Sequence, residues 1–326
     1  MFDIGNAQIV GARENQEDYL ASIEIGGGYL LIVADGMGGY EGGEVASKLV
    51  TKSFIEYFKH NFNTTTMGTL LTEASNYANE QLENEKDKTP SLEEMGCTLV
   101  ATFVRDNRLE WVSIGDSILY KFNPQSGLTR LNADHSVAGE LQKEVENGTL
   151  SQVEADAKPN RHALTSALTG YEIPHIEQAQ IQINEGDKII ITSDGIHTIN
   201  NDEISTICTS VDSSQALSDR LVQSVEKKSL PNQDNTTVIV LQKTIKKVQK
   251  IKNNQNSSNT MIFLFIIMIL IGVITVLVYL NYKEEIIKYT TTFVQGNDAN
   301  ISTEFNSTQE LDKNTSQVKE PHAPSK

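Results

Sequence analysis

Apolar residues form short runs separated by polar turns through the first 242 residues, and each run is typical of a β-strand. The runs that predict strands span residues 8–10, 19–25, 28–34, 97–104, 108–114, 118–122, 176–183, 188–192 and 237–241. Apolar residues recur near helical spacing over 41–60, 67–86, 138–146 and 214–227, which predicts four helices. Several strands follow one another without an intervening helix. The pattern therefore predicts an α+β fold, with helices packed on antiparallel sheets.

A different pattern follows residue 242. Residues 261–280 are 20 residues without a charge, rich in Ile, Leu, Val and Phe. A helix of that length, at about 1.5 Å per residue, crosses the roughly 30 Å hydrocarbon core of a bilayer. A buried core helix is the alternative, but the run lacks amphipathic spacing. We expect one transmembrane helix, with a basic and polar juxtamembrane linker at 243–260 and a polar, disordered tail at 281–326.

The charges around this apolar segment are unequal. Five lysines precede it, at positions 243, 246, 247, 250 and 252, whereas the two that follow, Lys283 and Lys288, are accompanied by Glu284 and Glu285. Basic residues next to a membrane span favour the cytoplasmic side. We therefore expect a single-pass membrane protein, with residues 1–242 in the cytoplasm and the tail outside.

Acidic residues dominate the segment before the span. The whole chain has 27 Lys and Arg against 43 Asp and Glu, and residues 1–242 alone have 17 basic and 36 acidic side chains, a balance of −19. This charge argues against a nucleic-acid partner and is compatible with cation binding. The two cysteines, Cys97 and Cys208, are too few for a disulfide framework and fit a reduced compartment.

Carboxylates stand where predicted strands end. Asp35 follows the apolar run 30–33 and begins the sequence Asp-Gly-Met-Gly-Gly, Asp194 follows the run 189–191, and Asp234 precedes the last strand. Three strand ends can gather carboxylates from distant parts of a chain, and carboxylate oxygens are hard ligands for Mg²⁺ or Mn²⁺. A turn explains each aspartate taken alone. Their repetition in one domain favours a metal site.

Four further residues extend this set. Arg13 precedes Glu17 and Asp18, so a guanidinium that can fork onto a phosphate stands beside two carboxylates, although a surface ion pair is the ordinary explanation. Asp116 occupies a turn between two strands, where turn capping is the alternative. No Gly-x-Ser-x-Gly elbow occurs and neither cysteine lies near a matching histidine, so nothing indicates a covalent nucleophile.

In order and spacing, these motifs resemble the metal-dependent protein phosphatases of the protein phosphatase 2C type. The matching motifs are Arg13-x-x-x-Glu17-Asp18, Asp35-Gly36-Met37-Gly38-Gly39, Gly115-Asp116-Ser117, Ser193-Asp194-Gly195 and Asp234-Asn235, with support from Gly96-Cys97-Thr98-Leu99, Asp134-His135-Ser136 and Leu164-Thr165-Ser166-Ala167-Leu168. The similarity covers residues 3–242. It implies a four-layer α-β-β-α sandwich with a metal cluster at one edge, between two antiparallel sheets.

The resemblance also implies a role for each residue. The site would hold two Mn²⁺ or Mg²⁺ ions, with a possible third. Asp35 would bridge the two ions, with Asp194 and Asp234 binding one and Glu17 and the Gly36 carbonyl binding the other. Asp18 would support the site from close by, and Asp116 would help to hold the third ion. Arg13 would bind the substrate phosphate. Position 37 is Met, where eukaryotic relatives carry a His that resembles a general acid, and Met cannot donate a proton. The region 134–161 corresponds to a variable flap beside the site.

The activity implied by the resemblance is hydrolysis of phosphoserine and phosphothreonine in proteins by a metal-bridged hydroxide, opposing a serine/threonine kinase. The first alternative is a catalytically silent domain of the same fold that binds a partner or senses a signal. A phosphatase for a small phosphorylated metabolite is a third hypothesis, which the acidic composition disfavours because small anions would be repelled.

Overall fold

The computed structural model describes residues 1–39, 41–243 and 255–304, with side chains in the last range only for 262–288. The chain divides into two units, Met1–Lys246 and Lys247–Lys326. The first unit contains two five-stranded antiparallel sheets, and the second contains one long helix.

The first sheet has the strand order β1-β12-β11-β8-β9, and the second has the order β10-β7-β6-β3-β2. The strands of the first sheet are β1 (Phe2–Ile9), β12 (Thr236–Lys243), β11 (Lys188–Thr192), β8 (Ile118–Asn123) and β9 (Gly127–Arg130). Those of the second are β10 (Glu177–Gln182), β7 (Arg108–Ile114), β6 (Leu99–Arg105), β3 (Gly28–Ala34) and β2 (Tyr19–Ile25). A small third sheet pairs β4 (Gly36–Met37) with β5 (Gly96–Cys97).

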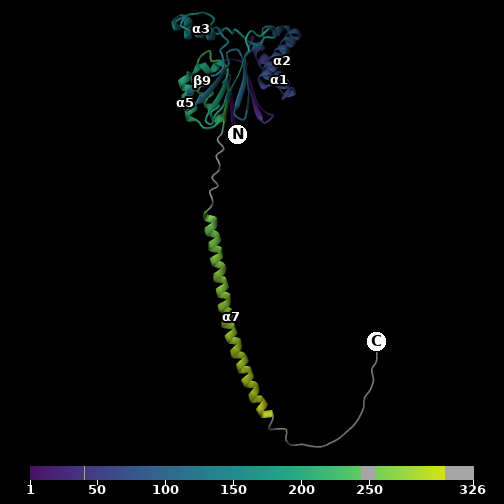
Figure 1. Ribbon diagram of the computed structural model, residues 1–326, viewed down its shortest axis with the longest axis vertical. Coiled ribbons are helices and arrows are strands. Elements are labelled where there is room, and N and C mark those ends of the chain that lie inside the picture. The colour runs from purple at the N-terminus through teal and green to yellow at the C-terminus, as the bar shows by residue number, and fades with distance from the viewer. Residues whose placement is uncertain (40, 244–254, 305–326) are drawn as a thin grey trace, which may run out of the picture. The chain divides into compact units, whose positions relative to one another are not determined.

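Helices cover the outer faces of both large sheets. The α-helices of the first unit are α1 (Gly42–His60), α2 (Met67–Lys88), α3 (Val137–Glu146), α4 (Gln152–Asp156), α5 (Asn201–Ser210) and α6 (Ser214–Glu226), and two short 3₁₀ turns span Pro90–Leu92 and Asp194–Thr198. Figure 1 shows α1 and α2 side by side on one flank of the sheets and α5 on the opposite flank. The expected four-layer α-β-β-α sandwich is confirmed.

Alternating side chains of the central strands build the core in three layers. In β3, Leu31 and Val33 belong to the apolar cluster between the two sheets, whereas Leu30 and Ile32 belong to the cluster under α1 and α2. A third cluster joins the first sheet to α5 and α6. Because successive residues of a strand point to opposite faces, a strand covered on both sides must be apolar throughout, as β3 is.

In the second unit, the described residues form the helix α7 (Gln255–Glu304). Within it, residues 262–288 are long and apolar enough to cross a bilayer, and none of their most apolar stretch is buried in protein. The helix also includes residues 281–304, which the sequence predicts to be part of a polar, disordered tail. Lys and Glu at 283–288 are good helix formers and continue it. Most of the predicted linker, residues 244–254, and the last 22 residues, 305–326, lie outside the described residues.

Candidate active site

A cavity of about 780 Å³ brings the sequence-predicted residues together from five places in the chain. Seven of the eight line it: Arg13, Glu17, Asp35, Gly36, Asp116, Asp194 and Asp234. The eighth, Asp18, is buried behind them, where its Oδ2 accepts a 2.7 Å hydrogen bond from the Ser193 hydroxyl. The strand-end pattern thus located one common site.

Asp35 is fixed at the end of β3 by Thr98, the residue between β5 and β6. The Asp35 amide donates to the Thr98 hydroxyl over 3.1 Å, and the Thr98 amide donates to the Asp35 carbonyl over 2.8 Å. The Thr98 hydroxyl also lies 2.7 Å from that of Ser117. This chain of contacts couples Asp35 to the turn that carries Asp116.

Gly36 allows three backbone segments to meet beside Asp35. Its amide donates to the Glu17 carbonyl over 3.2 Å. A Cβ at this position would lie 2.1 Å from the Gly43 carbonyl oxygen and 2.6 Å from that of Glu17. Any side chain would push Glu17 and the start of α1 away, so glycine is required by the close approach.

Asn235 holds the loop that carries Arg13 and Glu17. Its side-chain oxygen accepts a 2.7 Å hydrogen bond from the Glu17 amide. Its side-chain nitrogen donates to the carbonyls of Val10, over 2.7 Å, and Asn15, over 3.0 Å. The motif Asp234-Asn235 marked this position in the sequence, but these three partners lie more than two hundred residues away and gave no signal there.

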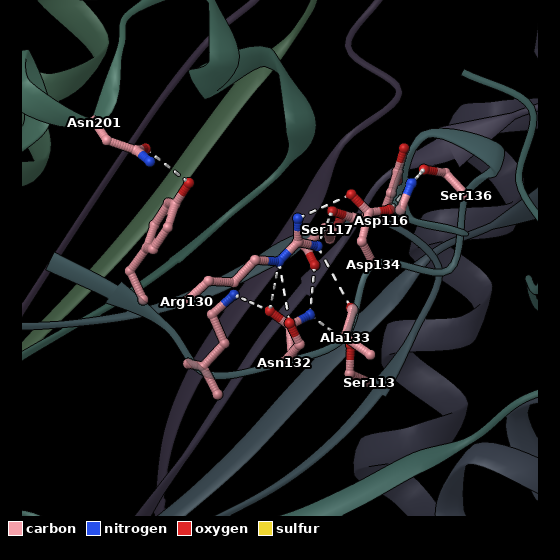
Figure 2. Close-up of polar contacts among 12 residues, drawn as sticks. Ser113, Asp116, Ser117, Arg130, Asn132, Ala133, Asp134, Ser136 and Asn201 are labelled. Atoms are coloured by element: carbon pink, nitrogen blue, oxygen red, sulfur yellow. Dashed lines mark hydrogen bonds and ion pairs between the residues drawn. The ribbon is translucent and has the colours of Figure 1, made fainter. Parts of the chain in front are cut away.

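Arg130, at the end of β9, is another positioning residue, and no motif in the sequence marked it. Figure 2 shows its guanidinium beside Asp116 and Asp134. Its Nη2 donates to the Asp116 carbonyl and its Nη1 to Asp134 Oδ2, each over 3.0 Å. Asp134 Oδ1 in turn accepts a 2.6 Å hydrogen bond from the Ser136 hydroxyl. Arg130 therefore fixes the backbone on which Asp116 is carried.

Arg13 is the cationic side chain in the cavity wall. Its Nη2 lies 2.6 Å from Asp234 Oδ2, and its side chain is 51% exposed. A guanidinium has five N–H donors, so the contact with Asp234 leaves donors for a phosphate.

Burial and mutual repulsion raise the pKa of the clustered carboxyl groups. Burial is the largest cause throughout, and it raises the pKa of Asp18 and of Asp116 to about 7. The pKa of Asp35 is held well above its ordinary value by burial and then by the charges of Asp18 and Asp194. Burial also raises the pKa of Asp194, and the charge of Asp234 raises it further.

This donor set fits divalent cations. It consists of carboxylate oxygens, the ligands that Mg²⁺ and Mn²⁺ prefer, in a place where nearby cationic charge is scarce. Asp18 Oδ1 is buried without a hydrogen-bond partner, and such an atom gains most from a cation close by. Among the described residues, no three His, Cys, Asp or Glu side chains already stand close enough to hold an ion together. Proton loss from the clustered carboxyl groups on cation binding would complete the site.

Comparison with known proteins agrees with this geometry. Residues 5–238, more than half of the chain, match the protein phosphatase 2C family profile. The chain belongs to the protein phosphatase 2C family. The serine/threonine protein phosphatase PstP of Mycobacterium tuberculosis is 32% identical over 232 residues, which are 70% of this chain but 42% of PstP. The chain therefore spans less than half the length of that relative.

Solved structures of the family share the fold. The Mycobacterium tuberculosis serine/threonine phosphatase PstP/Ppp superposes with a TM-score of 0.64 at 28% identity, covering 74% of this chain and 98% of that one. A catalytic domain of PstP, also 28% identical, was solved in complex with two manganese ions; it gives a TM-score of 0.62 and covers 74% of this chain and 99% of that one.

The raised pKa values of Asp18 and Asp116 predict how the stability of this phosphatase 2C domain depends on pH. Each folded-state pKa lies above the unfolded value, so the stabilisation is full below about pH 4 and is lost as pH rises through about 7. In chelator, the melting temperature should fall by several degrees from pH 5 to pH 8. Added Mn²⁺ should reverse the fall, because cations bind the deprotonated carboxylates. A metal-free melting temperature that rises over this range would contradict the assignment.

Proposed function

We propose that this chain is a metal-dependent phosphatase that removes phosphate from serine and threonine side chains of proteins. The observation that carries the proposal is the cavity in which Asp35, Asp194 and Asp234 meet beside the guanidinium of Arg13. An anionic phosphate binds there only if cations offset the carboxylates. Membership in the family and the name of PstP support the substrate class.

Each side chain has a distinct task in the proposed reaction. Asp35, Asp194, Asp234, Glu17 and the Gly36 carbonyl would hold two divalent cations, with Asp18 in support and Asp116 serving a third. When bound, such cations lower the pKa of a water ligand, so that hydroxide is present near neutral pH, and they stabilise charge on the phosphoryl oxygens. Arg13 would orient the phosphoryl group. Met37 lines the cavity and has no proton to donate, so the leaving alkoxide takes its proton from water or another group.

The direct test measures the hydrolysis of phosphorylated peptides by the full chain in detergent. Phosphoserine and phosphothreonine peptides should be hydrolysed in Mn²⁺ or Mg²⁺ and left intact in EDTA. A small sugar phosphate should react more slowly, because the negatively charged domain attracts no small anion. Turnover of neither peptide, together with tight Mn²⁺ binding, would instead identify a silent domain.

We also infer that the phosphatase is anchored in a membrane, faces the cytoplasm and opposes a serine/threonine kinase there. Support comes from the apolar stretch 262–288 of α7 and from the lysines that precede it in the sequence. Protease added to intact cells should remove only the segment beyond about residue 282, leaving the phosphatase domain whole. Digestion of the domain with the C-terminal segment spared would reverse the orientation and the proposed substrates.

A further inference from the structure

A second cavity, of about 450 Å³, lies where the segment 131–176 leaves β9 and returns to β10. None of the eight residues of the candidate active site lines it. Two histidines do, one from each end of the segment: His135 and His175. The segment between them includes α3, α4 and residues 162–169. Most of residues 162–169 line the 780 Å³ cavity of the candidate active site, which is called the acidic cavity below.

His135 is held rigidly and has a buried nitrogen without a partner. Its side chain is 8% exposed, and its Nδ1 makes no hydrogen bond. Its backbone amide donates to the Gly115 carbonyl over 3.1 Å, and its carbonyl accepts from the Thr165 amide over 2.8 Å. A buried polar atom without a partner is costly, so a ligand bound by this nitrogen would remove that cost.

His175 provides a second imidazole at a suitable separation. The two ring centres lie 5.9 Å apart with the planes inclined at 37°. Two imidazoles bound to one tetrahedral ion, each through a nitrogen about 2.0–2.1 Å from the metal, have ring centres roughly 5 Å apart. The His175 backbone is fixed on both sides by the Ser166 hydroxyl, which donates to its carbonyl over 2.8 Å and accepts from its amide over 3.1 Å. His175 is exposed, so its ring has room to rotate toward His135.

The surroundings favour a cation over an anion. Glu140 from the first turn of α3, Asp134 and Glu177 line the cavity, and Lys143 is the basic side chain that accompanies them. Glu177 Oε2 accepts a 2.6 Å hydrogen bond from the Ala133 amide, so it is held in place. Burial lowers the pKa of His135, and His175 and Lys143 lower it further, against the opposing effect of Asp134. The neutral imidazole, which is the form that binds metals, is therefore present at neutral pH.

We propose that His135 and His175 form a binding site for a transition-metal cation of the Zn²⁺ class, which ties together the two ends of segment 131–176. Imidazole selects such ions, whereas the carboxylates of the acidic cavity suit harder ions. The ion has two imidazole ligands, and water completes the coordination, since no three His, Cys, Asp or Glu side chains converge among the described residues. Its occupancy restrains the segment that borders the acidic cavity.

Zinc binding by the full chain in detergent tests the site, with Mg²⁺ in excess to occupy the carboxylates. Competition with a chromogenic chelator should detect one Zn²⁺ per chain, and X-ray absorption should show nitrogen ligands. His175→Ala should weaken binding about tenfold or more; its side chain is exposed, so the fold should survive. His60→Ala, at the end of α1, is the matched control and should bind as the parent does, as should Asp35→Asn, which alters the acidic cavity alone.

Limited trypsin digestion tests the restraint. Zn²⁺ should slow cleavage after Arg161, which precedes His162 within the segment, in the parent and in His60→Ala, but not in His175→Ala. Oxygen-only coordination, or equal zinc affinity in His175→Ala and the parent, would overturn the site. Cleavage unaffected by Zn²⁺ would overturn the restraint. Both readouts are independent of phosphatase activity.

Discussion

Asp35→Asn is expected to abolish metal-dependent hydrolysis while leaving the protein folded. Removing the carboxylate that would contact both cations should lower kcat/KM for an aryl phosphate by about a thousandfold or more, of the order expected for losing a catalytic ion. The buried, repelled carboxyl group already has a raised pKa. A neutral amide should therefore raise the metal-free melting temperature at pH 8, or leave it unchanged.

These two readouts separate lost chemistry from lost structure. Asp87→Asn, an exposed substitution near the end of α2, is a matched control that should keep the parental rate and melting temperature. An Asp35→Asn variant within tenfold of the parental rate in saturating Mn²⁺ would remove Asp35 from the catalytic set. If Asp35→Asn unfolds, the role of Asp35 would be to stabilise the fold and not to support catalysis.

Arg13→Ala is expected to lower kcat/KM by about a hundredfold, chiefly through KM, because a bidentate grip on the phosphate is lost. Arg13→Lys should recover part of the loss, since an ammonium supplies charge without the fork. The contact of Arg13 with Asp234 makes a second result measurable. Freed from its 2.6 Å ion pair, Asp234 should bind metal differently, so Mn²⁺ affinity should change in Arg13→Ala.

Arg108→Ala is the matched control for the charge change, because Arg108 is an exposed arginine that lies outside the cavity. It should leave KM and Mn²⁺ affinity as they are in the parent. If Arg13→Ala and Arg13→Lys both keep the parental KM, the phosphate-binding role is wrong.

Strands with continuous or alternating apolar residues were the part of the fold most accessible from sequence. The expected bounds of β2, β3, β7 and β11 match those in the structure, because continuous or alternating apolar runs define them. The first strand was expected only at residues 8–10 and instead spans Phe2–Ile9. Gly5 interrupts its pattern because α6 packs so closely that a Cβ there would lie 2.2 Å from the Gln215 amide nitrogen. That reason lies in the packing of a helix two hundred residues away.

The helix α5 was missed for a related reason. It buries only Ile204, Ile207 and Cys208, a stripe too narrow to stand out in the sequence. Its start is set by the Asn200 side chain, which accepts a 2.8 Å hydrogen bond from the Glu203 amide. A capping asparagine is a usable sequence signal, and here it was the only strong one.

The acidic residues of the site could be found from sequence, but the residues that hold them could not. Strand ends marked Asp35, Asp194 and Asp234, and the resemblance supplied the roles now proposed for them. The contributions of Asn235 and Arg130 depend on backbone carbonyls and amides. Every residue carries these groups, so no pattern of residue types can reveal which of them a side chain will meet.

Pairing of β1 with β12 brings the two ends of the domain together, with Phe2 opposite Lys243. At the other end of the same pair, Ile9 and Thr236 lead into the loops of Arg13 and Asp234. Strands of eight residues separate the two ends by roughly 25 Å. A short peptide could therefore join Phe2 to Lys243 in a circular permutant, and a fluorescent label or surface tether belongs at that same edge, where it leaves the mouth of the cavity clear.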